Sequence, residues 1–193
     1  MVTSSPKSYS KNNHDLVKIG SANNRKLKRF THNGQIQIYQ SSYRGSYSSI
    51  VRDSLRNAAL GRKVLLVQFM KGGVKQGISN AVKLCGNLTW VRSSHSFDQY
   101  HSEEIENNKN LKKSIHESTY ELWNYCKEEL LSGENDQIIL DEIFLAIKMK
   151  IIDKDDLIST LENRFILGDV ILTGTDIPKD LLLMANQITE LRS

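Results

Sequence analysis

Six short runs of apolar residues, each separated from the next by a longer segment of mixed composition, constrain the fold of this chain most strongly. The runs are rich in Ile, Val and Leu, and several are apolar at successive positions rather than at alternate ones. Because successive side chains of a strand point to opposite faces of a sheet, such runs predict strands that are covered on both faces. We expect strands at residues 35–39, 64–69, 88–91, 137–142, 169–174 and 187–191.

The segments between these runs have the pattern of helices. Residues 103–131 place apolar side chains about 3.6 positions apart, and they end before Gly133, a common helix stop. Residues 47–59 predict a second helix, residues 153–163 open with acids that suit a helix amino terminus, and Pro178 fits the first turn of another helix. Strands that alternate with helices in this way predict one α/β domain with a doubly wound, mostly parallel sheet.

Length and composition exclude several classes of protein. A chain of 193 residues can form one domain with its own core. No apolar run approaches the roughly 18 residues that a membrane span needs, and the amino-terminal residues lack the apolar segment of a secretory signal. Cys85 and Cys126 lie far apart, so neither a disulfide framework nor a strong zinc-site spacing is present. We expect a cytoplasmic protein with no membrane partner.

The positive charge of the chain is concentrated in residues 1–30. This leader holds seven of the 26 Lys and Arg residues and one of the 22 acids, so it carries +6 and the remainder carries −2. Its Ser, Asn and Lys content and its lack of hydrophobic periodicity predict a disordered segment, followed by the folded domain at 31–193. The leader is either a solubilising tail or an arm for an anionic partner. Few aromatic residues accompany its cations, so nucleic acid is not favoured as that partner.

Three predicted strands are followed by residues that suit ligand binding. Lys71 and two glycines follow the second strand, Asp141 and Glu142 end the strand at 137–142, and a Thr-Gly-Thr-Asp turn covers residues 173–176. In doubly wound sheets the carboxyl ends of the strands form the ligand-binding edge, so these three loops converge there. Paired acids after an apolar strand suit a magnesium-associated carboxylate, although acids also begin helices for electrostatic reasons.

Three segments of the chain resemble a known family. Residues 61–73 (GRKVLLVQFMKGG), 137–153 (QIILDEIFLAIKMKIID) and 169–191 (DVILTGTDIPKDLLLMANQITEL) are similar to the ATP:corrinoid adenosyltransferases of cobalamin biosynthesis. The resemblance extends from about Gly34 to Leu191 and implies a P-loop NTPase fold of the RecA-like type. It also implies ATP and a Co(I) corrinoid as substrates, either cob(I)alamin or cob(I)yrinic acid a,c-diamide. Mg²⁺ would accompany the ATP, and the chain would be a possible homodimer.

The resemblance also implies the residues of the site. Asp141 matches the metal-associated acid, and Glu142 and Arg56 match residues with catalytic roles. The positions that match ATP-binding and corrinoid-binding residues of the family are Arg44, Gly45, Ser46, Ser48, Lys71 and Phe97.

The phosphate loop departs from the family pattern. Residues 40–48 read Q-S-S-Y-R-G-S-Y-S, where the family reads approximately T-G-N-G-K-G-K-T-T. The loop lysine is missing, and a charge-assisted hydrogen bond contributes roughly 1.5–3 kcal/mol, so ATP affinity should fall about ten- to a hundred-fold. Ser41 and Tyr43 replace glycines whose backbone could adopt positive φ near phosphates. We expect phosphate binding in the manner of the family to be lost.

Two functions therefore remain open from the sequence. In the first, the chain is an adenosyltransferase that holds ATP loosely. In the second, it is a catalytically inactive relative that binds a corrinoid, a nucleotide or a protein. The retained segments around Lys71 and Asp141 favour the first function. The altered phosphate loop favours the second, as does the corrinoid-facing segment at 96–99, which has lost the tryptophan of the family pattern G-F-T-W.

Overall fold

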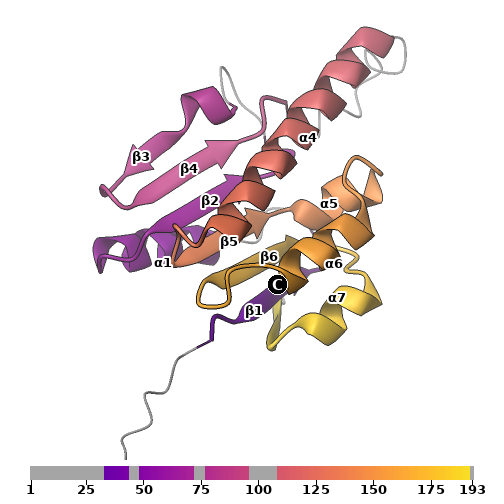
Figure 1. The fold of residues 1–193 in the computed structure, drawn as a ribbon. Helices are drawn as coiled ribbons and strands as arrows, with labels where there is room; N and C mark the ends of the chain where they lie inside the picture. The colour runs from indigo at the N-terminus through magenta and orange to yellow at the C-terminus, as the bar shows by residue number, and fades with distance from the viewer. Residues whose placement is uncertain (1–32, 44–47, 72–76, 96–107, 192–193) are drawn as a thin grey trace, which may run out of the picture. The chain divides into compact units, whose positions relative to one another are not determined.

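The computed structural model describes residues 33–43, 48–71, 77–95 and 108–191. These residues form a seven-stranded sheet in the order β3-β4-β2-β5-β6-β1-β7 (Figure 1). Neighbouring strands are parallel, except that β3 is antiparallel to β4. The strands are β1 (Ile36–Ser41), β2 (Val64–Gln68), β3 (Val82–Leu84), β4 (Leu88–Arg92), β5 (Gln137–Asp141), β6 (Asp169–Gly174) and β7 (Gln187–Leu191).

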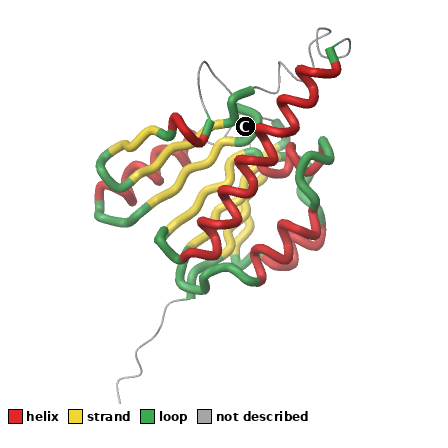
Figure 2. Tube along the Cα trace, turned by 45° about the horizontal axis from the view of Figure 1, so that its top comes forward, coloured by secondary structure: helices red, strands yellow, loops and turns green. Residues whose placement is uncertain are grey.

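Helices connect the strands and cover both faces of the sheet, so the predicted doubly wound α/β architecture of the P-loop NTPase type is confirmed. The tube in Figure 2 shows the strands of the sheet side by side, with the long helix α4 running across them. The helices are α1 (Ser48–Ala59), the short 3₁₀ helix η1 (Ile78–Asn80), α4 (Lys109–Ser132), α5 (Ile143–Lys148), α6 (Lys154–Glu162) and α7 (Lys179–Met184).

The two faces of the sheet form separate hydrophobic clusters. Leu65 and Val67 of β2 pack in the larger cluster with α4, α5, α6 and α7. Val64 and Leu66 of the same strand belong to the smaller cluster with α1. All five residues of β2 are buried, which explains why the sequence is apolar at successive positions rather than at alternate ones.

All six predicted strands are present, with ends that differ from the prediction by one or two residues at most. Three short elements were missed: the strand β3, the helix α5 and the 3₁₀ helix η1. The edge strand β3 has only three residues, two of them exposed, so it carries no run of apolar residues. The helix α5 has four buried residues in succession, from Ile143 to Ala146, and therefore has no polar face to reveal its period. The part of the predicted helix at residues 103–107 lies outside the described residues.

The helix ends follow local chemistry. The Asn108 side chain accepts a hydrogen bond from the Leu111 amide at the start of α4, and Gly133 ends this helix at φ 73°, as predicted. Asp153 caps α6 by accepting from two backbone amides. Pro178 is the residue directly before α7, one position earlier than the predicted first turn.

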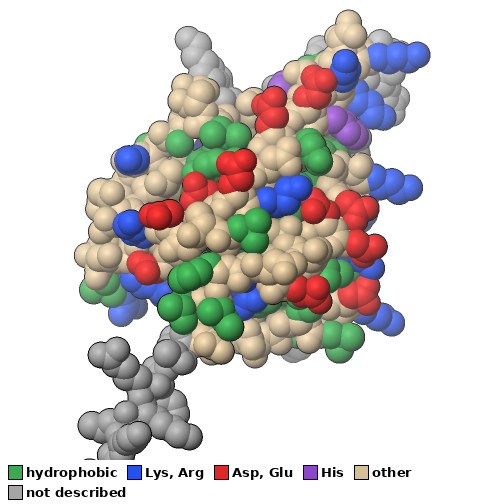
Figure 3. All heavy atoms as spheres, in the orientation of Figure 1, with side chains coloured by type: hydrophobic (Ala, Val, Ile, Leu, Met, Phe, Trp, Pro, Cys, Tyr) green, Lys and Arg blue, Asp and Glu red, His purple; other side chains and the backbone are tan. Residues whose placement is uncertain are grey.

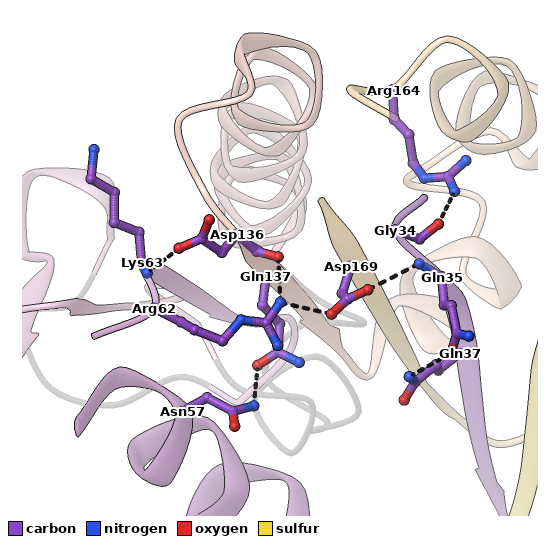
Figure 4. A network of polar contacts seen from close by, with 10 residues as sticks. All are labelled: Gly34, Gln35, Gln37, Asn57, Arg62, Lys63, Asp136, Gln137, Arg164 and Asp169. Atoms are coloured by element: carbon purple, nitrogen blue, oxygen red, sulfur yellow. Dashed lines mark hydrogen bonds and ion pairs between the residues drawn. The ribbon is translucent and has the colours of Figure 1, made fainter. Parts of the chain in front are cut away.

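A polar network ties together the amino ends of the strands (Figure 4). The Asp169 carboxylate accepts hydrogen bonds from the Gln35 amide at 3.0 Å and from the Arg62 guanidinium at 2.7 Å. Arg62 also donates to the Asp136 carbonyl, and Asn57 of α1 donates to the Gln137 side chain at 2.9 Å. These contacts join the starts of β1, β5 and β6 to α1 and to the turn before β2, and so hold the sheet at the edge opposite the predicted site.

The face shown in Figure 3 carries acidic and basic side chains interspersed with one another. Ion pairs on this side of the sheet include Lys127–Asp156 at 3.0 Å and Lys148–Asp176 at 2.6 Å. In the part of the chain that the structure describes, no helix combines the length and the apolar character needed to cross a membrane.

Candidate functional site

The carboxylate of Asp141, at the carboxyl end of β5, is the centre of a buried polar cluster. Its Oδ2 atom accepts hydrogen bonds from Gln68 Nε2 at 2.7 Å and from Lys71 Nζ at 2.8 Å. Its Oδ1 atom accepts from Thr173 Oγ1 at 2.6 Å. The Asp141 side chain is only 2% exposed, whereas that of Lys71 is 27% exposed. The cluster therefore places a buried negative charge beside a cation that reaches solvent.

Thr173 links this carboxylate to the following turn. Its hydroxyl donates to Asp141 and accepts from the backbone amide of Glu142 at 2.9 Å. Glu142 is buried and has φ 63°, a left-handed conformation that is unfavourable for a residue with a side chain. Met70, after β2, also has a positive φ of 54°. Unfavourable backbone conformations that the surrounding structure maintains are concentrated at functional sites in proteins, so they support a functional role for this edge.

Gln68 extends the cluster to β4. Its Oε1 atom accepts from Trp90 Nε1 and from Arg92 Nε, both at 3.0 Å. The guanidinium of Arg92 lies over the Trp90 ring, 4.1 Å from its centroid, in cation–π geometry. Because two donors hold Oε1, the amide nitrogen of Gln68 must face Asp141. A continuous hydrogen-bonded chain thus crosses four neighbouring strands, from Arg92 to Thr173.

A pocket of about 410 Å³ opens at the end of β4, beside this chain of hydrogen bonds. The end of β4, the region of η1 and the middle of α4 form its walls. The lining residues include Arg92, Glu121 and several serines. The Arg92 guanidinium itself bonds Gln68 and lies over the Trp90 ring. A pocket of this size can hold a small molecule or part of a larger one.

The structure brings together three of the predicted site residues: Lys71, Asp141 and Glu142 lie at the carboxyl edge of adjacent strands. The predicted convergence of the three loops is therefore confirmed by the Lys71–Asp141 and Asp141–Thr173 contacts. The predicted residues Arg44, Gly45, Ser46 and Phe97 lie outside the described residues.

The two predicted site residues on α1, Ser48 and Arg56, lie at opposite ends of the helix. Ser48 is exposed at the first residue of the helix, which follows the carboxyl end of β1. Arg56 is exposed about 12 Å farther along the helix axis. The residue after it, Asn57, donates a hydrogen bond to the Gln137 side chain at the start of β5. This turn of α1 therefore lies level with the amino ends of the strands. The described structure does not bring Arg56 together with Asp141.

The residues around Asp141 suit a magnesium ion that arrives with a nucleotide. Among the described residues, no group of three or more His, Cys, Asp or Glu could hold a metal by itself. Magnesium bound with a nucleotide needs only one or two protein carboxylates, because phosphates and water supply the other ligands. Asp141 fits this mode, provided that the Lys71 ammonium moves from Oδ2 toward the phosphates. Lys71 has the length and the solvent access to do so.

Sequence reasoning missed Gln68, Trp90 and Arg92 as members of the site. Gln68 and Trp90 lie within the runs at 64–69 and 88–91, which were assigned to strands of the core sheet. One signal was available: a glutamine within an otherwise apolar strand needs hydrogen-bond partners when it is buried. Its partners come from strands that are neighbours only in the folded sheet, so the sequence did not identify them.

Comparisons with known proteins agree with this geometry. The family model described as ATP:corrinoid adenosyltransferase BtuR/CobO/CobP matches residues 32–193. The chain is 24% identical over 160 residues to the corrinoid adenosyltransferase of Escherichia coli strain K12, covering 82% of this chain and 76% of that protein. It is 23% identical over 167 residues to the corrinoid adenosyltransferase CobA of Salmonella typhimurium strain LT2, with the same coverage of each chain.

Proposed function

Because the chain belongs to the ATP:corrinoid adenosyltransferase family, we propose that it transfers the 5′-deoxyadenosyl group of ATP to a Co(I) corrinoid. In this reaction the Co(I) electron pair forms the bond to the 5′-carbon. The bond between that carbon and its phosphate oxygen breaks, and triphosphate leaves with the bonding electrons. The cobalt is oxidised formally to Co(III), so no other oxidant or reductant is required.

The observation that carries the proposal is the Lys71–Asp141 contact of 2.8 Å at the carboxyl edge. A buried carboxylate beside a partly exposed lysine can exchange one cation for another: Asp141 would hold Mg²⁺, and Lys71 would then contact a phosphate oxygen. Magnesium would supply charge neutralisation to the triphosphate as it leaves. Lys71 then provides at the end of β2 a positive charge in addition to Arg44 of the loop at 40–48, in which Ser46 stands where the family pattern has a lysine.

The other predicted residues take roles in the same proposal. Arg44, Ser46, Ser48 and the Gly45 backbone contact the triphosphate, Phe97 contacts the corrinoid, and Glu142 orients the reacting groups. Arg56 has no role in this proposal, because its turn of α1 lies level with the amino ends of the strands. The absence of the loop lysine predicts affinity for MgATP about ten- to a hundred-fold weaker than that of a family member with an intact loop.

The test combines calorimetric titration with MgATP and an anaerobic adenosylation assay with a reduced corrinoid. Lys71→Met should weaken MgATP binding about ten-fold or more and lower turnover, because it removes a charged partner of the phosphates. Lys63→Met, which removes a cation that is 64% exposed at the opposite edge, is the matched control and should leave both quantities unchanged. Circular dichroism establishes that each variant is folded. Turnover unaffected by Lys71→Met would refute the proposed role of this lysine.

A second candidate function is a binding module without catalysis, and the altered loop at 40–48 favours it. Such a protein would keep Lys71 on Asp141 as a permanent ion pair that neutralises the buried charge. It would bind a corrinoid, another nucleotide or a protein at the same edge. Undetectable MgATP binding together with no adenosylation by the wild-type chain would establish this function over the first. We also propose that the chain works in the cytoplasm and that it forms a homodimer. Its molecular mass in solution would test the homodimer.

A further inference from the structure

Arg92 and Asp141 belong to one row of side chains across the carboxyl edge of the sheet. Arg92 of β4 pairs with Gln68 of β2, and Gln68 pairs with Asp141 of β5. Two residues before the ends of this row, Trp90 and Ile139 pack in or against the smaller hydrophobic cluster with α1. Because the side chains of a strand alternate between its two faces, the row lies on the face of the sheet that carries α1.

The helix α1 begins at this edge and on this face. Ser48, its first residue, is exposed and comes after the carboxyl end of β1, and the helix contacts β2 and β4. The amino terminus of a helix carries a partial positive charge and attracts anions. The start of α1 therefore adds to the preference of this edge for an anionic ligand.

The Arg92 side chain is held in place by two contacts. Its Nε atom donates to Gln68 Oε1 at 3.0 Å, and its guanidinium lies 4.1 Å from the centroid of the Trp90 ring. Its terminal NH₂ groups have no hydrogen-bond or ion-pair partner within the described part of the chain. A guanidinium fixed in this way loses little conformational entropy when it binds a ligand, and its fork of donors matches a phosphate group.

Arg92 lies close enough to Asp141 to contact a ligand bound there. The path from Arg92 Nε to Asp141 Oδ2 consists of two hydrogen bonds, of 3.0 and 2.7 Å, joined by the amide group of Gln68. These two atoms are therefore no more than about 8 Å apart. A ligand that extends several ångströms from Asp141, as a triphosphate does, would come within reach of the terminal NH₂ groups of Arg92.

We propose that Arg92 binds the triphosphate of ATP and so partly replaces the missing loop lysine. This inference rests on the proposed function, because it assigns a further binding residue for the same substrate. The loop at 40–48 has a serine at the lysine position, whereas Arg92 reaches the ligand-binding edge from β4. Two cations, Lys71 and Arg92, then lie beside Asp141 on neighbouring strands, and an arginine can bind a phosphate through two parallel hydrogen bonds.

Two substitutions of Arg92 distinguish phosphate binding from a role that only positions Gln68. Arg92→Gln keeps an amide that can donate to Gln68 but removes the charge. Arg92→Lys keeps the charge but loses the planar group that lies over Trp90. Phosphate binding predicts that Arg92→Gln weakens the affinity for MgATP about ten-fold or more and that Arg92→Lys weakens it less. A positioning role predicts the reverse order.

Calorimetric titration of the full chain with MgATP, and separately with the magnesium salt of inorganic triphosphate, measures these affinities without turnover. Inorganic triphosphate has no adenine, so Arg92→Gln should weaken the binding of both ligands to the same extent. Circular dichroism establishes that each variant is folded.

Lys83→Gln is the matched control, because it removes the same charge from the neighbouring strand β3. Lys83 is exposed. The residues on either side of it, Val82 and Leu84, line a small cavity together with Trp90 and Arg92, so Lys83 points to the other face of the hairpin. The control should leave the affinity for both ligands unchanged.

Each other outcome has a defined meaning. If Arg92→Gln binds both ligands as tightly as Lys83→Gln does, the inference is overturned and the proposed function stays intact. The same holds if Arg92→Gln weakens MgATP but not triphosphate, which would assign Arg92 to the adenosyl group, or if Arg92→Lys binds more weakly than Arg92→Gln. Failure of the wild-type chain to bind either ligand overturns the inference and the proposed function together.

Discussion

Replacing Thr173 by valine should destabilise the domain by about 3 kcal/mol, although the two side chains have nearly the same shape. The Thr173 hydroxyl is fully buried, donates to Asp141 at 2.6 Å and accepts from the Glu142 amide at 2.9 Å. A hydrogen bond to a charged group contributes about 1.5–3 kcal/mol, and an unpaired buried amide costs about 1–3 kcal/mol. The two contributions share one hydroxyl, so the expected total lies between about 2 and 5 kcal/mol.

Urea unfolding followed by circular dichroism measures this free energy directly. The denaturation midpoint should fall while the slope of free energy against urea stays unchanged, because the surface exposed on unfolding is the same. In a thermal scan, a domain of this size should lose about 6–12 °C of melting temperature.

Thr189→Val on the edge strand β7 is the matched control. The Thr189 hydroxyl makes only a 3.5 Å contact with the Gln187 side chain, so its replacement should change the free energy of unfolding by less than about 0.5 kcal/mol. If Thr173→Val were no more destabilising than Thr189→Val, the reasoning about the Asp141 cluster would be wrong, since its buried hydrogen bonds would contribute nothing measurable.

Three further predictions follow from the described structure. Burial by itself raises the pKa of Asp156, but hydrogen bonds from Trp123 and Lys127 of α4 and the charge of Lys127 lower this pKa overall from 3.8. The stability that these contacts provide is therefore present above that pH and is lost as the pH falls below it. Lys127→Met should make the decline in unfolding free energy with acid shallower, as measured by urea titrations at several pH values. Gly34→Ala should destabilise the domain by roughly 3 kcal/mol or more in urea unfolding, because the new Cβ would lie 2.1 Å from a backbone carbonyl oxygen, and normal stability would contradict this packing. Cys85 is exposed, whereas Cys126 is buried and has a pKa raised well above its usual range by burial and then by a neighbouring acid; a thiol reagent should modify one cysteine of the native chain rapidly and the second only after unfolding, and rapid reaction of both would contradict the burial.

Much of the fold could be predicted because the relevant signals are local. The apolar runs that became β2, β5 and β6 are continuous in sequence, and their burial on both faces follows from that continuity. The predicted stop of α4 at Gly133 also depends on one residue and its φ of 73°. Two of the elements that were missed, β3 and α5, are short and owe their conformation to strand pairing and to packing from all sides, respectively.

For the site, the sequence determined which edge of the sheet would carry polar residues and which acids would stand there. Asp141 ends an apolar strand, Glu142 follows it, and Lys71 follows another strand, so a parallel sheet had to place them at one edge. Only the tertiary structure decided how they are connected. Thr173, Gln68 and Arg92 reach Asp141 or one another across strands that lie tens of residues apart in the chain, and hydrogen bonds act over about 3 Å of space regardless of sequence separation.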